Sequence, residues 1–284
     1  MRTNFTLLFL LLLINSIYSQ GFKGDTWADA LKNKSANVVL TNAHLPKFSE
    51  AKDGKGSGLC FDIMNDFASY VFRQYGVRIT YQYRPVANTS NFESFLSAVR
   101  NSNGGVFGLG DITITDERKS TYDFTPSYFS NMAILITKKG VPELTSLSKI
   151  PVTFKGMRAV SQGGTTHDVR LKEMQKKYGF DIINAASSVD KTYRVITSSK
   201  YFTYIDLPNY LELSSKGEEV RRHPAGDIPG ESYGFIMPKG SDWAPIITEF
   251  FNANGGYVKS AKYKKVLSDN LGPEVVKLMG SIAK

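Results

Sequence analysis

One stretch of the chain, Gly110 to Arg118, gathers residue types that bind anions. It reads Gly-Asp-Ile-Thr-Ile-Thr-Asp-Glu-Arg. A strand is predicted to end near Thr113, and Thr115 is a favourable N-cap for a helix that begins at Asp116. Arg118 then falls in the first turn of that helix, at the sheet edge where open α/β sheets bind ligands. Its planar guanidinium is suited to a carboxylate, helped by the hydroxyls of Thr113 and Thr115.

The same stretch also fits an ordinary capped helix on the protein surface. In that interpretation Arg118 pairs with its neighbour Asp116 or Glu117 and binds no ligand. The residue pattern alone does not separate the two interpretations.

Two later stretches could complete a site for a small charged molecule. Residues 161–166 read Ser-Gln-Gly-Gly-Thr-Thr and join a predicted strand to a predicted helix. Glycines there let backbone amides approach an anion, which a helix N-terminus also favours. Asp206 ends a strand shortly before Pro208 and offers a carboxylate to a cation. On pattern alone, an ordinary glycine turn explains the first stretch better, and a turn-capping aspartate is a common explanation of the second.

The rest of the sequence offers little for catalysis or metal binding. The histidines, His44, His167 and His223, show no metal-ligand spacing, and the single cysteine, Cys60, excludes a thiolate zinc site. There is no Gly-x-Ser-x-Gly elbow, Walker loop or dinucleotide-binding glycine motif. We interpret His167 and Asp168 as a pair on a helix surface. We therefore expect no catalytic residue, no metal and no cofactor.

The elements that position these residues alternate between strand and helix. Strands are predicted at 38–40, 79–83 and 106–109, with helices at about 63–72 and 92–99. After a strand at 132–137 the pattern restarts, with strands at 158–161, 201–205 and 233–237 and a helix at about 166–178. Helices at about 243–251 and 263–267 form a tail. The order predicts two α/β units in succession, and does not say whether the tail rejoins the first.

The N-terminus has the features of a secretory signal peptide. Arg2 precedes an apolar run from Phe5 to Ile14, and we place the cleavage after Ser19. The run is too short to span a bilayer, which takes about 20 apolar residues. Because the leader has no cysteine, we expect a soluble periplasmic protein and not a lipoprotein.

The charge of the chain argues against a nucleic-acid partner. The formal net charge is +9, and it falls to +8 when Arg2 leaves with the signal peptide. The basic residues are scattered in isolated pairs, whereas a nucleic-acid site needs a clustered stripe. A solvated basic surface is the better interpretation, and attraction to an acidic partner stays open.

The block from Thr113 to Arg118, followed by Asp123-Phe124-Thr125 and Tyr128, resembles the signature of family 3 bacterial solute-binding proteins. Those proteins are the polar amino-acid receptors of ABC importers, and they are related to the ligand core of ionotropic glutamate receptors. Weaker similarities extend over nearly the whole mature chain, at Leu45-Pro46-Lys47-Phe48, Gly58, Asp62-Ile63, Tyr233-Gly234-Phe235 and Gly255-Gly256.

The resemblance implies a two-lobe α/β architecture, the periplasmic-binding-protein type II fold. Two discontinuous α/β lobes would be joined by two crossing strands, near 132–137 and 233–238. Lobe 1 would comprise residues 20–135 and 236–284, including the helical tail, and lobe 2 residues 136–235. A monomer would close its lobes around an amino acid or similar small zwitterion and deliver it to an ABC transporter permease.

The resemblance also implies roles for the charged residues. The arginine at the place of Arg118 holds the α-carboxylate of the ligand, and Thr113 adds its hydroxyl and backbone amide. Thr165 and Thr166 would contact the same carboxylate from the far lobe. Asp206 would pair with the ligand ammonium.

Three further positions stay open. Position 111 usually offers a backbone carbonyl to the ligand amine from a small residue, so Asp111 departs from the family pattern. It would either add negative charge to the amine site or turn away. Phe48 and Tyr128 are candidates for apolar packing around the ligand, and both could equally be core aromatics.

Two other functions are weighed against transport. Exported cyclohexadienyl dehydratases share the fold and resemble the turn at Gly163-Gly164-Thr165, although no convincing general acid can be assigned here. A ligand-sensing module for a signalling partner is the third interpretation. A fused transmembrane segment would support it, and the sequence pattern predicts none.

Overall fold

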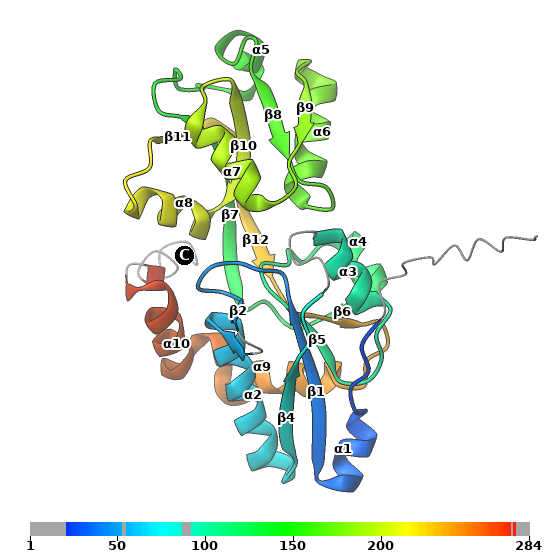
Figure 1. Cartoon of the computed structure of the whole chain (residues 1–284). Helices are drawn as coiled ribbons and strands as arrows, with labels where there is room; N and C mark the ends of the chain where they lie inside the picture. The colour runs from blue at the N-terminus through cyan, green and yellow to red at the C-terminus, as the bar shows by residue number, and fades with distance from the viewer. Residues whose placement is uncertain (1–20, 53–54, 87–91, 274, 277–284) are drawn as a thin grey trace, which may run out of the picture.

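The structure, a computed structural model, describes residues 21–52, 55–86, 92–273 and 275–276. They form two lobes, one above the other in Figure 1, each built around its own sheet. The two-lobe α/β fold predicted from the sequence is confirmed. The predicted signal peptide, residues 1–19, lies outside the described residues.

Lobe 1, the lower part of Figure 1, contains a five-stranded sheet in the order β4-β1-β5-β13-β6. The strands are β1 (Ser35–Asn42), β4 (Arg78–Tyr83), β5 (Val106–Leu109), β6 (Tyr122–Phe124) and β13 (Ile236–Pro238). β1 runs parallel to β4 and β5, whereas β13 runs antiparallel to β5 and β6. The other elements are α1 (Trp27–Asn33), α2 (Leu59–Tyr75), α3 (Phe92–Arg100), α4 (Asp116–Thr121) and the hairpin of β2 (Glu50–Lys52) and β3 (Lys55–Ser57).

Lobe 2 contains a sheet in the order β11-β7-β10-β8-β9, with β12 also paired to β7. The strands are β7 (Phe129–Lys138), β8 (Arg158–Ser161), β9 (Ile182–Asn184), β10 (Tyr201–Asp206), β11 (Val220–Arg222) and β12 (Ile228–Tyr233). β8, β9 and β10 are parallel, and β7 is antiparallel to its partners. The helices are α5 (Ile150–Thr153), α6 (Thr166–Tyr178), α7 (Ser188–Thr197) and α8 (Leu207–Ser215), with 3-10 turns at Leu147–Lys149 and Pro224–Gly226.

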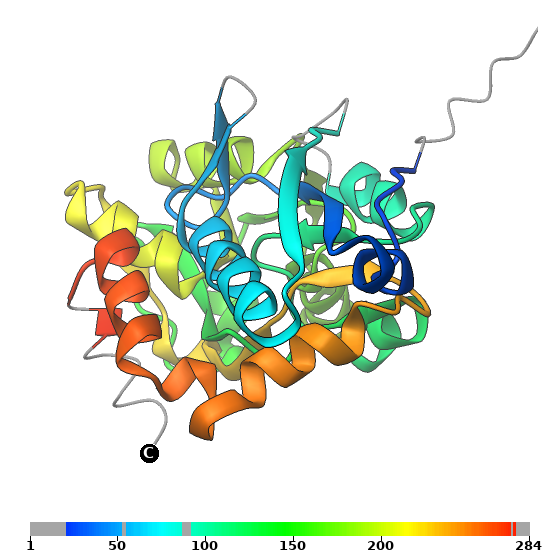
Figure 2. The same cartoon turned by 90° about the horizontal axis from the view of Figure 1, so that it is seen from below.

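The strands β7 and β12 run side by side between the lobes (Figure 1). The tail helices, α9 (Ala244–Asn252) and α10 (Ala261–Leu271), return to lobe 1 and pack against α2, as the view from below shows (Figure 2). Between them lie 3-10 turns at Ala253–Gly255 and Tyr257–Lys259. The tail therefore rejoins the first lobe, as the family resemblance implied. The lobe boundaries at 135/136 and 235/236 stay predictions.

The single strand predicted at 233–237 is wrong. β12 ends at Tyr233 and β13 begins at Ile236, because the two halves pair in different lobes. Gly234 lies at the break and donates its N–H to the carbonyl of Ile112 at 3.1 Å. A Cβ there would lie 3.0 Å from the Ile114 side chain and 3.1 Å from the carbonyl oxygen of Thr125. The glycine allows the chain to pass closely from one sheet to the other.

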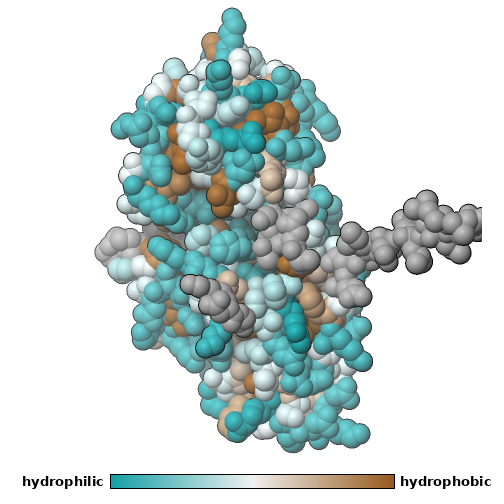
Figure 3. All heavy atoms as spheres, in the orientation of Figure 1, coloured by the Kyte–Doolittle hydropathy of each residue, from teal (hydrophilic) through white to brown (hydrophobic). Residues whose placement is uncertain are grey.

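The molecular surface shown in Figure 3 is largely hydrophilic, with hydrophobic residues in separate groups. Within the part of the chain that the structure describes, no helix combines the length and apolar character needed to span a membrane.

The prediction that the protein is a monomer is not tested by a structure of one chain, and it stays a prediction.

A buried histidine in lobe 2 makes the stability of the fold depend on pH. His223 follows β11; its Nε2 lies 2.8 Å from the Thr137 hydroxyl, and its Nδ1 accepts the Leu144 N–H at 3.0 Å. Burial, and next the positive charge of Arg221, lower the pKa of His223 to about 4. In an unfolded chain the pKa of histidine is about 6.5, so unfolding at pH 5 takes up a proton.

We therefore expect the stabilisation by neutral His223 to be complete above pH 6.5 and to be lost as pH falls toward 4. Between pH 7.5 and pH 5 the loss amounts to about 2 kcal/mol of unfolding free energy. Urea unfolding at several pH values measures it. The control is His223→Asn, which lacks the titrating group and should show a pH profile flatter by that amount. Equal slopes for the two proteins would contradict the prediction.

Candidate ligand-binding site between the lobes

A cavity of about 300 Å³ lies where the two lobes meet. Small-molecule pockets span roughly 300–1,000 Å³, so this one suits a small ligand. Six of the eight predicted binding residues line it, three from each lobe: Asp111, Thr113, Arg118, Thr165, Thr166 and Asp206. The other lining residues are Ala43, His44, Leu45, Phe92, Gln162, His167, Ser187, Ser188, Val189, Lys191 and Asn209.

Arg118 lies on α4, which begins as predicted, with the Thr115 hydroxyl accepting the Arg118 N–H at 3.1 Å. The guanidinium reaches across the cleft. Its Nη1 donates to the carbonyl of Thr113 and its Nη2 to the carbonyl of Gly164 in lobe 2, both at 3.0 Å. It also lies 5.3 Å from the ring centroid of Phe92. Two of its five N–H donors are used in these bonds, which leaves donors for a ligand carboxylate.

The surface-helix interpretation of Arg118 is wrong. Among the described residues Asp116 pairs with Lys119 at 3.2 Å, and the Arg118 side chain hydrogen-bonds to backbone carbonyls instead. Burial lowers the pKa of Arg118, while the negative charge of Asp111 opposes that shift. A half-buried cation with a planar set of donors, lining a cavity, is suited to bind a carboxylate.

Thr165 and Thr166 lie at the N-terminus of α6, opposite Arg118. The Thr165 hydroxyl accepts the Asp168 N–H at 3.1 Å and donates to the Gln162 carbonyl at 2.8 Å. The stretch is thus both a capped turn and part of the cavity wall. Gly164 has a φ of +76°, and a Cβ there would lie 2.5 Å from the Glu93 side chain of lobe 1. Glycine lets the two lobes approach closely beside Arg118.

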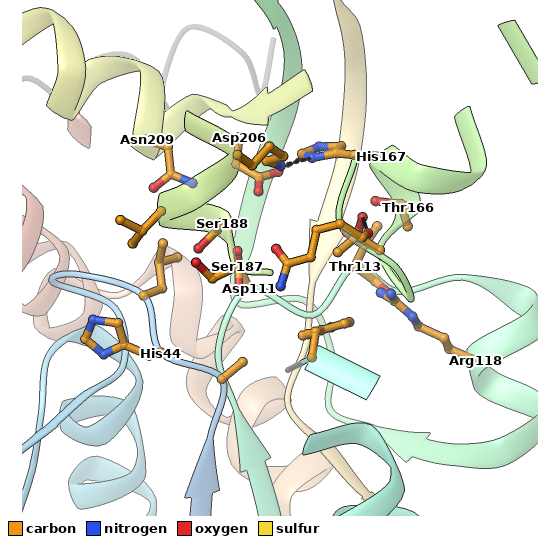
Figure 4. A pocket seen from close by; sticks show the side chains of 17 residues that line it. His44, Asp111, Thr113, Arg118, Thr166, His167, Ser187, Ser188, Asp206 and Asn209 are labelled. Carbon is orange, nitrogen blue, oxygen red and sulfur yellow. Dashed lines mark hydrogen bonds and ion pairs between the residues drawn. The ribbon is translucent and has the colours of Figure 1, made fainter. Parts of the chain in front are cut away.

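Asp206 ends β10 at the N-cap position of α8, but its side chain makes no capping hydrogen bond. The turn-capping explanation is therefore wrong. Its Oδ1 accepts from Asn131 Nδ2 at 2.6 Å and lies 3.5 Å from His167 Nε2 (Figure 4). Burial opposes the charge of Asp206, yet His167, then Tyr233 and Lys191, hold its pKa well below the usual range. Asp206 is therefore an ionised carboxylate that lines the cavity.

Lys191 is a lining residue that the sequence analysis missed. It lies on α7 and is only 5% exposed. Its Nζ donates to the Tyr204 carbonyl at 3.0 Å and lies 3.4 Å from His167 Nδ1. Burial lowers the pKa of Lys191, and the charges of Asp206 and Asp111 oppose that shift.

A sequence signal for α7 existed. Ser187 and Asp190 have the spacing of a helix cap, and the Ser187 hydroxyl accepts the Asp190 N–H at 3.1 Å. The signal would have located the helix but not the burial of Lys191, because lysine is almost always exposed.

Residues 38–265 match the family of bacterial extracellular solute-binding proteins, family 3. The chain belongs to that family. The resemblance inferred from the arginine block is thus confirmed.

The relatives of this family 3 protein agree with the assignment. It is 24% identical over 251 residues to a probable histidine-binding protein of Neisseria gonorrhoeae, covering 82% of this chain and 89% of the relative. An ancestral arginine-binding protein bound to arginine has the same fold, with a TM-score of 0.65 at 21% identity over 83% of this chain and 98% of that one. So does the ancestral amino acid-binding protein AncCDT-1, a precursor of cyclohexadienyl dehydratase, with a TM-score of 0.65 at 19% identity over 86% and 98% of the two chains.

In this family 3 protein Asp111 lines the cavity, opposite Asp206 of the other lobe (Figure 4). Burial, and next the negative charge of Asp206, raise the pKa of Asp111 to about 7, while Lys191 and Arg118 oppose that shift. Two carboxylates from different lobes therefore face one small volume. A ligand cation between them would favour ionisation of both.

The interpretation of His167 and Asp168 as a surface pair is wrong. Their exposed fractions are 4% and 5%, because the start of α6 packs over the sheet of lobe 2. The His167 ring lies 6.0 Å from that of Tyr204, and Asp168 accepts the Ser161 hydroxyl at 2.6 Å. His167 lines the cavity, whereas Asp168 does not.

One group of potential metal ligands occurs among the described residues. Ligand atoms of His167, Asp206 and Glu231 all lie within 4.8 Å of one another. Arg170 Nη2 lies 2.5 Å from Glu231 Oε1, and Asn131 donates to both carboxylates at 2.6 and 2.7 Å. The carboxylates are thus already paired, and the group is best described as an ion-pair network. The expectation of no metal stays a prediction.

The structure does not bring Phe48 and Tyr128 to this cavity. Both are buried in the core of lobe 1, where Phe48 packs against Phe129 with ring centroids 5.1 Å apart. The Tyr128 hydroxyl donates to the carbonyl of Gly110 at 2.7 Å. Tyr128 therefore supports the backbone just before Asp111.

Proposed function

We propose that this family 3 protein captures an α-amino acid between its lobes in the periplasm and delivers it to an ABC transporter permease. One observation carries the proposal: Arg118 and Asp206, of opposite charge and on different lobes, line the same small cavity (Figure 4). In this proposal Arg118 binds the α-carboxylate and Asp206 the ammonium. The similarity to a probable histidine-binding protein, an ancestral arginine-binding protein and an ancestral amino acid-binding protein supports this class of ligand.

The threonines around Arg118 complete the carboxylate site in this proposal. Thr113 would contribute from lobe 1, and Thr165 and Thr166 from the start of α6 in lobe 2. Charge-assisted hydrogen bonds contribute about 1.5–3 kcal/mol each. About four of them support micromolar binding, about −8 kcal/mol, after the cost of ordering. Because the ligand touches both lobes, it shifts the hinge equilibrium toward closure.

Thermal-shift screening of residues 20–284 against the common amino acids tests the proposal. A ligand present at 100 times its Kd stabilises the folded state by about 2.7 kcal/mol, so a clear rise of the melting temperature is expected. If no amino acid raised it, the proposed function would fail.

The raised pKa of Asp111, about 7, predicts a pH dependence of binding. A ligand ammonium beside Asp111 favours its ionised form, so binding releases a proton and affinity rises with pH. We expect about a tenfold gain between pH 6 and pH 8. Calorimetry at several pH values measures it, and Asp111→Asn should remove most of the gain. An unchanged profile in that variant would place Asp111 outside the ammonium site.

The dehydratase interpretation predicts turnover rather than binding alone. AncCDT-1 is itself described as an amino acid-binding protein, which fits binding on this fold. We expect no aromatic product when the purified protein is incubated with arogenate or prephenate. Turnover would replace transport as the function.

A further inference from the structure

We propose that Asn131, on one of the two strands that run between the lobes, is a positioning residue for ligand binding. Its amide holds both the Asp206 carboxylate and the start of α8, and so keeps the carboxylate directed at the cavity and away from the helix. This inference rests on the proposed function, because it assumes that Asp206 binds the ligand ammonium. Asn131 does not itself line the cavity, so it acts through Asp206.

Asp206 occupies a position from which an aspartate ordinarily caps a helix. It is the N-cap residue of α8, where a carboxylate accepts the backbone N–H of the second or third helical residue. The second is Pro208, which has no N–H, so Asn209 carries the N–H that the carboxylate could accept. Asp206 makes no such hydrogen bond. Its direction is therefore set by other contacts.

Asn131 makes contacts that fix this direction. One N–H of its amide donates to Oδ1 of Asp206 at 2.6 Å, and its Oδ1 accepts the N–H of Leu207, the first residue of α8, at 3.1 Å. One amide thus holds the carboxylate and the adjacent backbone at two points. Because Asn131 is only 1% exposed, these hydrogen bonds are shielded from water.

The other N–H of the Asn131 amide donates to Oε2 of Glu231 at 2.7 Å. Glu231 lies on β12, directly opposite Asn131 on β7 (Figure 1). The register of the two strands shifts by one residue between Pro229 and Glu231. Without the extra residue, Gly230, Glu231 would lie opposite Ser130 and its side chain would point to the other face of the sheet. The shift therefore brings Glu231 to Asn131.

Two buried carboxylates consequently share one amide. Glu231 also pairs with Arg170 of α6 at 2.5 Å, and Asp206 lies 3.5 Å from His167 Nε2. Both N–H groups of the amide are used, and its oxygen accepts as well. Loss of the amide would remove a charge-assisted hydrogen bond from Asp206 and leave its carboxylate free to turn toward α8.

Calorimetry of Asn131→Leu with an amino acid, and with the acid of the same length that lacks the amino group, tests the inference. Leucine has nearly the shape of asparagine but forms no side-chain hydrogen bond. We expect amino-acid affinity to fall by about ten- to 100-fold, as for the loss of one charge-assisted hydrogen bond, and affinity for the deaminated acid to change by less than about threefold. A residue that only stabilised the fold would weaken both ligands equally. Equal losses, or no loss for either ligand, would overturn the inference.

Thr203→Val is the matched control. Thr203 is buried on β10, the strand that ends at Asp206, and its hydroxyl donates to the Val160 carbonyl at 2.6 Å without lining the cavity. Valine removes that buried hydrogen bond from the same lobe, so the melting temperature should fall while the ratio of the two affinities stays that of wild type. A ratio that changed as much as in Asn131→Leu would count against the inference.

Asn131→Ala is a milder variant that leaves room for water beside Asp206, and it decides the question where Asn131→Leu does not fold. Its affinity ratio should change in the same direction. Its crystal structure should show the Asp206 carboxylate accepting the N–H of Asn209, and a carboxylate that kept its place would overturn the inference. If the wild-type protein bound no amino acid, the proposed function would fail; if only the Asn131 predictions failed, the proposed function would stand.

Discussion

Replacement of Arg118 by alanine is expected to weaken amino-acid binding by about 100- to 4,000-fold. The ligand carboxylate would then be buried beside the threonines without its cation. Removing one partner of a buried charge pair costs about 3–5 kcal/mol, and each 1.4 kcal/mol is a factor of ten in affinity. Calorimetry with the best amino acid from the thermal-shift screen measures the change.

Two controls make this result specific. Arg118→Lys keeps the charge but loses the two-pronged geometry, so its affinity should fall between wild type and alanine. Arg73→Ala removes an exposed arginine from α2, outside the cavity, and should bind like wild type. Undiminished binding by a folded Arg118→Ala protein would show that the carboxylate lies elsewhere.

Replacement of Asp206 by alanine is expected to separate amino acids from their deaminated counterparts. The ammonium loses its anion, so amino-acid affinity should fall by about 100-fold. An acid of the same length without the amino group never used Asp206, and its affinity should change only a few-fold. Calorimetry with such a pair of ligands measures the difference, which is independent of any general loosening of the cleft.

A second variant of Asp206 separates the loss of its charge from the loss of its packing. His167 and Asn131 contact its carboxylate, so the alanine variant leaves a small gap in a buried network. Asp206→Asn keeps the shape and removes the charge, and it should show the same preference for the deaminated acid. Asp181→Asn, at an exposed position of lobe 2, serves as the charge control. Equal losses for both ligands would remove Asp206 from the ammonium role.

Local sequence predicts the position of those site residues that are placed by their immediate neighbours in the chain. The Thr115 cap places Arg118 in the first turn of α4, and the strand end places Asp206 at the carboxyl edge of its sheet. Both depend on residues within a few positions of the side chain concerned. Such signals can be recognised without knowing what packs against them.

The rest of the site depends on contacts between distant parts of the chain. Lys191 is buried, and its Nζ donates a hydrogen bond to the backbone carbonyl of Tyr204 on β10; no local sequence pattern reports that contact. His44 and Asn209 line one cavity only because the lobes close on each other. From the sequence alone, Phe48 could not be distinguished from an aromatic residue that packs against the ligand. Its burial against Phe129 is a long-range contact.

Prediction of the fold from sequence was limited by long-range contacts in the same way. The α/β alternation and the family resemblance predicted two lobes, and the strand and helix spans of the central elements agree closely with the structure. The family resemblance implied a crossing near 233–238, but the break of the strand at Gly234 was missed, because residues 233–237 form one continuous apolar run. Only pairing to two different sheets divides the run into β12 and β13.

A crystal structure with the best-binding amino acid present tests the account most directly. We predict one ligand in the interlobe cavity, with its carboxylate about 3 Å from the Arg118 guanidinium and its ammonium about 3 Å from the Asp206 carboxylate. A ligand bound with those groups reversed, or outside the cleft, would contradict the claim that two opposite charges on separate lobes grip a single zwitterion.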